Sequence, residues 1–212
     1  MPFRDGSKLP LPFADVRSKY NVATLSTGST DTIGESLAIC RYVEESQVAT
    51  GGERVRLFGC GPLQRAKVEM WTRRVELELL FSSVGKAWYH GPTLAPMRKS
   101  SGLTAHTSEL QLGMRTAQRF YKEVERELQA KGPFLAGEDF TVADITLLCV
   151  LDFGAGPVQV PMLWSKLPHL LAWHVRVSAR ESVRLHKDPY RPQGSPIYAD
   201  RNVDGVQGSS KL

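Results

Sequence analysis

FLAGEDFTVADITLLCVLDF, residues 134–153, carries the most specific local signal in the chain. Its Thr141-x-x-Asp144 spacing predicts a capping box, in which each of the two side chains satisfies a free amide at a helix start. The residues that follow are apolar almost all round, so we expect a helix over residues 141–153 at the centre of a helical core. An unpaired amide at such a buried helix end would cost about 1–3 kcal/mol. We therefore assign Thr141 and Asp144 a structural role.

Helical periodicity continues on both sides of this stretch. Apolar residues at alternating spacings of four and three predict a helix over residues 103–130, and Pro168 starts a last amphipathic helix. A long helix begins near Pro62 and runs to about Trp88. It carries two apolar stripes, one at Leu63, Met70, Leu77 and Val84 and another at Val68, Trp71, Val75 and Leu79. Two stripes predict two buried contacts, one within the bundle and one with a neighbouring domain or subunit.

The first part of the chain has a different character. Residues 21–26 and 30–33 flank a turn and predict a β-hairpin, and residues 35–48 predict a helix with one apolar face. We divide the chain into an α/β segment (1–50), a linker (51–61), an all-helical domain (62–185) and an irregular tail (186–212). The fold class is mainly α.

Composition excludes several classes of protein. The 212 residues carry a net charge of +5, but basic residues alternate with acidic ones along the predicted helices, which argues against nucleic-acid binding. No apolar run is long enough to span a membrane, and no secretory signal is visible. The odd number of cysteines and the spacing of the histidines give no disulfide framework and no metal site. We place Cys40 and Cys149 in the core and expect a cytoplasmic protein.

A second signal lies at Glu35 and Ser36, where a helix follows a strand. Free amides and a hydroxyl at a helix start can bind a carboxylate, and the Glu35 carboxylate can accept hydrogen bonds from an ammonium group. The pair would fit the zwitterionic end of an amino acid. The alternative is that Ser36 is an ordinary residue of a first helical turn.

Taken together, these motifs resemble the glutathione transferase family. FLAGEDFTVAD is similar to the start of the buried helix in that family's C-terminal domain, and the block at Glu35-Ser36 is similar to its γ-glutamyl site. Further similarity lies at LFG (57–59), PLQRA (62–66), VEMW (68–71) and LPHL (167–170). The resemblance implies a helical bundle after a thioredoxin-like segment, with glutathione as co-substrate and no tightly bound cofactor. It also implies a small electrophile as second substrate and a homodimer.

The resemblance also implies particular residues and particular losses. Val22 would contact the cysteinyl part of glutathione, although Ala23 stands where the family has a cis-proline. One βαβ unit needs about 30 residues or more, and only 34 residues precede Glu35. We therefore expect a truncated thioredoxin-like segment without its first strand, first helix and second strand, and we assign no thiolate-activating residue. The long helix would contribute to the electrophile pocket through Trp71, Arg74, Trp88 and Tyr89.

Three hypotheses follow from this resemblance. The first is a glutathione transferase that directs the glutathione thiolate at an electrophilic carbon, a disulfide or a peroxide. The second is a non-catalytic dimerisation or scaffolding module of the same fold. The third is a shortened gene product whose upstream residues would supply the rest of the first domain.

Overall fold

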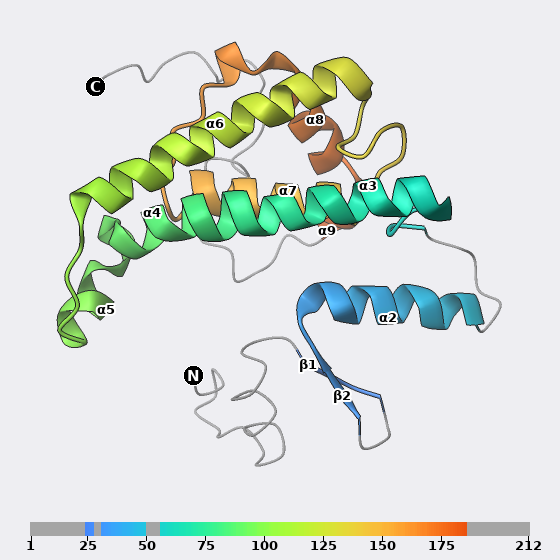
Figure 1. The fold of residues 1–212 in the computed structure, drawn as a ribbon, viewed down its shortest axis with the longest axis horizontal. Helices are drawn as coiled ribbons and strands as arrows, with labels where there is room; N and C mark the ends of the chain where they lie inside the picture. Colours follow the sequence, from blue (N-terminus) through green and yellow to red (C-terminus); the bar gives the residue numbers. More distant parts are fainter. Residues whose placement is uncertain (1–23, 28–30, 50–55, 186–212) are drawn as a thin grey trace. The chain divides into compact units, whose positions relative to one another are not determined.

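A computed structural model describes residues 24–27, 31–49 and 56–185 of the protein (Figure 1). Its contacts divide the chain into two units, residues 1–57 and 58–212. The predicted tail after residue 185 lies outside the described residues. Within the described ranges, no helix combines the length and the hydropathy that crossing a bilayer requires.

The first unit contains the predicted hairpin and helix. Strand β1 (Thr24–Ser26) pairs antiparallel with β2 (Thr32–Gly34), and the register sets Leu25 opposite Ile33. Helix α2 (Ser36–Ala49) follows after one residue and contacts both strands. The Leu57 amide donates to the Glu44 carboxylate at 2.6 Å, which ties the end of this unit back to α2.

The second unit begins with the predicted long helix, which has three parts. Helix α3 (Gly61–Arg74) continues into a π-helical segment, η1 (Val75–Val84), and then into α4 (Gly85–His90). A π-helix bonds each residue to the fifth one along the chain. The hydroxyls of Ser82 and Ser83 follow the same spacing, donating at 2.6 Å to the carbonyls five residues earlier. Nothing in the sequence indicates this π-helical segment.

The π segment explains which residues of the two apolar stripes are buried and which are exposed. Val68, Trp71, Val75 and Leu79 are all buried, as predicted for the bundle contact. In the other stripe Leu63, Met70 and Leu77 are exposed, by 70%, 47% and 51%, whereas Val84 is fully buried. Because π turns hold more residues than α turns, the seven-residue spacing loses its phase within η1 and Val84 rotates into the core.

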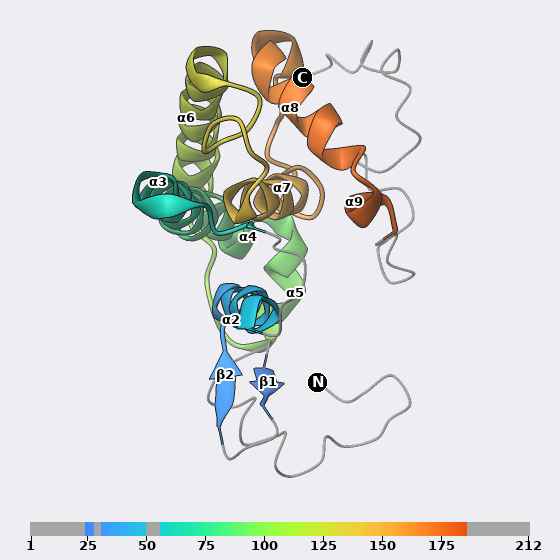
Figure 2. The same cartoon turned by 90° about the vertical axis from the view of Figure 1, so that its right-hand side faces the viewer.

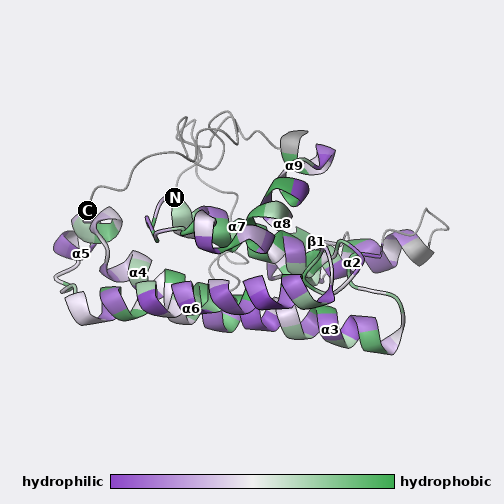
Figure 3. Cartoon of the chain, turned by 90° about the horizontal axis from the view of Figure 1, so that it is seen from above, coloured by the Kyte–Doolittle hydropathy of each residue, from purple (hydrophilic) through white to green (hydrophobic). Residues whose placement is uncertain are grey.

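The remaining elements pack around the long helix. A short connection holds η2 (Pro92–Leu94) and α5 (Ala95–Ser100), and it leads to α6 (Thr107–Lys131). Helix α7 (Val142–Ala155) lies between the long helix and α8 (Pro168–Ser178) (Figure 2). The short η3 (Trp164–Lys166) precedes α8, and α9 (Glu181–Leu185) follows it. Purple and green turns mix along α3 and α6, as expected of helices with one buried and one exposed face (Figure 3).

Two expectations about this unit are wrong in detail. Helix α6 begins at Thr107 rather than at Leu103, because the Leu103 amide instead donates at 2.9 Å to the Arg98 carbonyl and closes the end of α5. Cys149 is exposed, and so is Cys40 in the first unit, although both were expected in the core. Helix α7 contacts η1, α3 and α8 on only part of its circumference. One side of it, which includes Cys149, is therefore exposed although the helix is apolar.

Close backbone packing fixes α6 against the long helix. A Cβ atom added at Gly113 would lie 2.6 Å from the Ser83 carbonyl oxygen and 2.8 Å from the Ala87 nitrogen. Only glycine allows this approach, so the α6 backbone rests directly on the junction of η1 and α4. The core of this unit includes Trp173, Leu147 and Tyr121, which are at most 1% exposed.

Candidate functional site

The turn between β2 and α2 holds the two residues that the sequence assigns to an anion site. Gly34 ends β2 in a buried position, and Glu35 follows with a left-handed backbone at φ 66°. This conformation is uncommon outside glycine. Helix α2 begins at Ser36, and its first backbone hydrogen bond joins the Ile39 amide to the Glu35 carbonyl at 3.0 Å. The chain therefore turns sharply from strand to helix, with both candidate side chains exposed.

This turn offers hydrogen-bond donors beside an acceptor. The amides of Ser36, Leu37 and Ala38 precede the first bonded amide and have no carbonyl partner within the helix. Together with the helix dipole they favour an anion, and the Ser36 hydroxyl adds another donor. The Glu35 carboxylate stands next to them as an acceptor for a cation. Val22, the third residue assigned to glutathione, lies outside the described residues.

The capping box lies deep in the helical unit. Thr141 and Asp144 form the box at the start of α7, and neither residue is exposed. One Asp144 oxygen accepts from the Thr141 amide at 2.9 Å and from its hydroxyl at 3.1 Å. The other accepts from the Leu135 amide at 2.9 Å and from the Trp173 indole at 2.8 Å. One carboxylate therefore joins the loop before α7, the start of α7, and α8.

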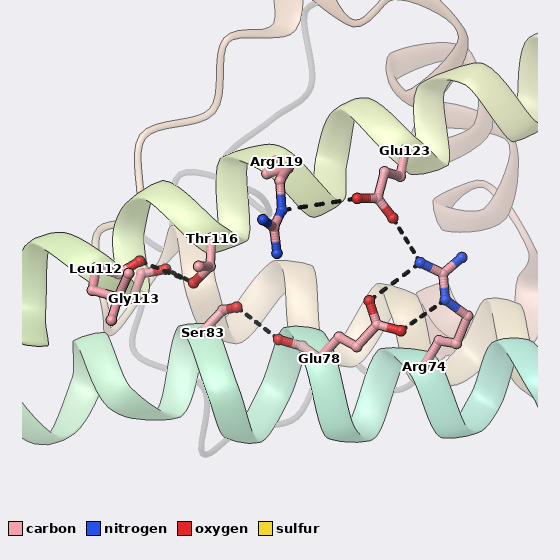
Figure 4. Close-up of polar contacts among 8 residues, drawn as sticks. All are labelled: Arg74, Glu78, Ser83, Leu112, Gly113, Thr116, Arg119 and Glu123. Carbon is pink, nitrogen blue, oxygen red and sulfur yellow. Dashed lines mark hydrogen bonds and ion pairs between the residues drawn. The ribbon is translucent and has the colours of Figure 1, made fainter.

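Trp71 and Arg74 are brought together. Arg74 also belongs to an ion-pair network with Glu78 and Glu123 (Figure 4). The Arg74 guanidinium lies 4.8 Å from the Trp71 ring centre and 5.5 Å from that of Phe120. It donates to Glu78 at 2.8 Å and to Glu123 of α6 at 2.6 Å. The hydrogen bond to Glu78 raises the Arg74 pKa, and the same bond lowers the Glu78 pKa. The Arg74 charge is thus balanced within the protein.

A groove lies beside this network, between η1 and α6. It has a volume of about 240 Å³, with Phe120 among its walls. The hydroxyls of Ser83 and Thr116 donate to backbone carbonyls of their own helices, so their oxygens remain as acceptors. Arg119 approaches Glu123 at 3.9 Å and is otherwise exposed. The other groove residues are Glu78, Ser82 and Glu123.

Trp88 and Tyr89 lie apart from that network. They follow Trp71 by more than four turns, which corresponds to about 20 Å along the helix axis. The Trp88 ring packs edge-to-face on Phe153 of α7, with ring centres 5.2 Å apart. Tyr89 packs on His90 at 4.9 Å. Among the described residues, the four aromatic and basic candidates form two separate sites.

Several interaction partners of the candidate residues could not be predicted from the sequence. The spacing of four residues between Arg74 and Glu78, and between Arg119 and Glu123, was a usable signal for ion pairs along one helix. Nothing in the sequence indicated that Arg74 would also reach Glu123 on another helix. Nothing in the sequence indicated the left-handed backbone at Glu35 either. Within the described part of the chain, no cluster of three His, Cys, Asp or Glu side chains is arranged to hold a metal ion.

Comparison with known proteins places this geometry in context. The family described as "Glutathione S-transferase, C-terminal domain" matches residues 89–181. Glutathione S-transferase 2 of Saccharomyces cerevisiae is 33% identical over 159 residues, which cover 72% of this chain and 60% of the yeast protein. Glutathione S-transferase F9 of Arabidopsis thaliana is 27% identical and is covered to 65% of its length. The chain therefore spans less than two thirds of these curated relatives.

Solved structures give the same result for the fold. A glutathione S-transferase domain-containing protein from Marinobacter aquaeolei VT8 is 30% identical to this chain, with a TM-score of 0.66. The match covers 80% of this chain and 79% of the Marinobacter protein. The helical unit and the hairpin-helix segment thus belong to an architecture already seen in crystals.

Proposed function

The chain belongs to the glutathione transferase family, and from that premise we propose that it binds glutathione at Glu35 and Ser36 and conjugates it, through its sulfur, to a small electrophile. The observation that carries the proposal is the turn before α2. It presents the Glu35 carboxylate, the Ser36 hydroxyl and the amides at the start of α2, and both Glu35 and Ser36 are exposed. A left-handed backbone at a non-glycine residue costs about 1–3 kcal/mol and is concentrated at functional sites. Glu35 has this backbone.

The chemistry of this turn matches the γ-glutamyl end of glutathione, which carries one carboxylate and one ammonium group. The carboxylate would accept from the Ser36 hydroxyl and from the amides at the start of α2. The ammonium group would donate to Glu35. Once its thiolate is stabilised, the sulfur would bond to an electrophilic carbon as the leaving group departs, or attack one sulfur of a disulfide and release the other as a thiol. Reduction of a peroxide to an alcohol and water would oxidise two glutathione molecules to their disulfide.

Calorimetry with glutathione tests this site. Hydrogen bonds to charged groups contribute about 1.5–3 kcal/mol, so we expect Ser36→Ala to weaken glutathione binding by roughly tenfold or more. Ser108→Ala is the matched control, because Ser108 is also exposed in the first turn of a helix. Conjugation of glutathione to chlorodinitrobenzene is the readout of turnover. A folded protein that gives no heat with millimolar glutathione would eliminate the site.

We also propose a homodimer formed through Met70 and Leu77 of the exposed stripe together with Phe81, another exposed apolar residue of the long helix. Met70, Leu77 and Phe81 are 47%, 51% and 67% exposed. The neighbouring network carries two arginines and two glutamates, Arg74, Arg119, Glu78 and Glu123. A surface with balanced charges suits a twofold contact, in which the same patch meets itself. The non-catalytic alternative keeps this dimer and lacks only the binding of glutathione.

Light scattering tests the dimer. We expect Phe81→Ser to shift the protein toward monomer, while Leu163→Ser, which changes another exposed apolar residue, leaves its mass unchanged. Equal masses for wild type and Phe81→Ser would contradict this interface. The proposal also includes a cytoplasmic location, which the exposed and unbridged cysteines Cys40, Cys60 and Cys149 support.

A further inference from the structure

Two arginines at the end of α8 lie on two phenylalanine rings of the loop that precedes α7. The Arg180 guanidinium lies 3.9 Å from the centre of the Phe140 ring, and that of Arg176 lies 5.8 Å from the centre of the Phe134 ring. The two rings pack edge-to-face on each other, with their centres 5.8 Å apart. Both arginines are exposed, and both rings are half-buried. We call these four side chains the Arg–Phe cluster.

The backbone that carries this cluster is fixed. Phe134 and Gly137 exchange two backbone hydrogen bonds, at 3.0 and 3.1 Å, which fold the loop into a tight turn. The Asp144 carboxylate joins this loop to α8, because it accepts from the Leu135 amide and from the Trp173 indole. A surface that is ordered before its partner arrives loses less conformational entropy on binding. The cluster is therefore preorganised.

The positive charges of the cluster are not neutralised within the described residues. The ion pairs that α8 makes there involve its two histidines, His169 and His174, and neither arginine. Arg176 donates once, at 2.8 Å, to the Pro133 carbonyl, and the Arg180 guanidinium donates no hydrogen bond within the same ranges. An aromatic ring covers the flat face of a guanidinium and leaves the N–H groups at its edge free. The cluster therefore offers unused donors and positive charge to an anion.

The spacing of the two arginines favours a pair of carboxylates as the ligand. A guanidinium fork matches the two oxygens of a carboxylate. Arg176 and Arg180 are four residues apart, which corresponds to about 6 Å along a helix. Alternate residues of an extended chain project to the same side at a separation of about 6.6–6.8 Å. An extended segment with acidic residues at alternate positions would therefore set one carboxylate on each guanidinium.

A nucleic-acid backbone suits this surface less well. Such ligands are held by a row or patch of basic residues that neutralises several phosphates. Here the neighbours in sequence are acidic, since Glu138 and Asp139 precede Phe140 and Glu181 follows Arg180. All three acidic residues are exposed. They would repel a continuous polyanion, whereas a segment with two carboxylates needs to meet only the two arginines.

We propose that the Arg–Phe cluster binds an extended acidic segment of a partner protein. Arg176 and Arg180 each pair with one carboxylate of the segment, and Phe134 and Phe140 hold the two guanidinium planes in place. The surface includes no residue of the turn before α2, so this interaction does not depend on the binding of glutathione.

NMR titration with a synthetic peptide tests the surface. The probe is a short peptide, blocked at both ends, in which glutamate alternates with threonine, and the same peptide with glutamine is the control ligand. We expect the glutamate peptide alone to shift the Nε–H signals of Arg176 and Arg180. Arg176→Gln and Arg180→Gln should each weaken binding about fivefold. Arg115→Gln is the matched control, because Arg115 is an exposed arginine of α6 that donates to Gln111 of its own helix.

Arg180→Lys separates the geometry of the cluster from its net charge. Lysine keeps the charge but lacks the planar fork, so we expect this variant to bind about threefold more weakly than wild type. Equal affinity of wild type and Arg180→Lys would overturn the pairing with a carboxylate. The proposal would also be overturned by equal binding of the glutamine peptide, by an equal loss in Arg115→Gln, or by unshifted arginine signals at millimolar peptide. Binding of oligothymidylate without binding of the glutamate peptide would replace it with a nucleic-acid surface.

Discussion

Removing the Asp144 carboxylate should be among the most damaging single changes in the helical unit. Its oxygens accept hydrogen bonds from the Leu135 amide, the Trp173 indole, and the amide and hydroxyl of Thr141. In Asp144→Ala the hydroxyl can turn elsewhere, but three buried N–H groups lose their acceptor. Each buried group left unsatisfied costs about 1–3 kcal/mol. Because the structure relaxes in part and water enters, we expect the free energy of unfolding to fall by about 3–5 kcal/mol. This is a large part of the stability of a typical domain.

Asp144→Asn separates hydrogen bonding from cavity formation. The asparagine oxygen can still accept from Leu135 and Trp173, but its amide nitrogen then faces the Thr141 amide, donor against donor. One orphaned amide should cost about 1–3 kcal/mol, so this variant should fall between Asp144→Ala and wild type.

Urea unfolding followed by circular dichroism measures these losses. The control is Asp139→Ala, since Asp139 is an exposed carboxylate in the preceding loop and accepts a single side-chain hydrogen bond, from Gln64 at 2.8 Å. We expect the control to cost less than about 1 kcal/mol. If Asp144→Ala were no more destabilising than Asp139→Ala, the carboxylate would not be the junction described here.

The sequence predicted most of the helical unit because local patterns and tertiary packing agree there. The spacing of Thr141 and Asp144 indicated the start of α7, and the stripe through Val68 and Trp71 indicated the buried face of the long helix. Both features depend on residues within a few turns of each other. The indole of Trp173 as a partner of Asp144 could not be predicted, since it comes from a helix that is distant in sequence.

The errors arise where backbone geometry departs from the regular α-helix. The seven-residue stripe predicted Val84 on the same side as Leu77, but the π turns of η1 rotate Val84 into the core. No residue in η1 is characteristic of a π-helix, so periodicity alone could not reveal the change of phase. At the candidate site, Glu35 and Ser36 could be named from the sequence. The left-handed backbone of Glu35, which gives the turn its shape, could not.

Two further changes probe how α6 is held. Gly113→Ala should destabilise the protein by about 1–3 kcal/mol in thermal or urea unfolding, because its Cβ would lie 2.6 Å from the Ser83 carbonyl oxygen; an unchanged unfolding midpoint would contradict the direct backbone contact. Glu125→Gln concerns the other end of α6, where the carboxylate accepts from the amides of His169 and Leu170 and from the His169 ring. Burial by itself would raise the Glu125 pKa, but these hydrogen bonds lower it below its ordinary value. A depressed folded-state pKa adds stability above the unfolded pKa that is lost as the pH falls through the folded one. Wild type should therefore lose more stability than Glu125→Gln as the pH falls from about 5 to 3. If the urea midpoints of the two proteins changed in parallel across that range, Glu125 would not hold the start of α8.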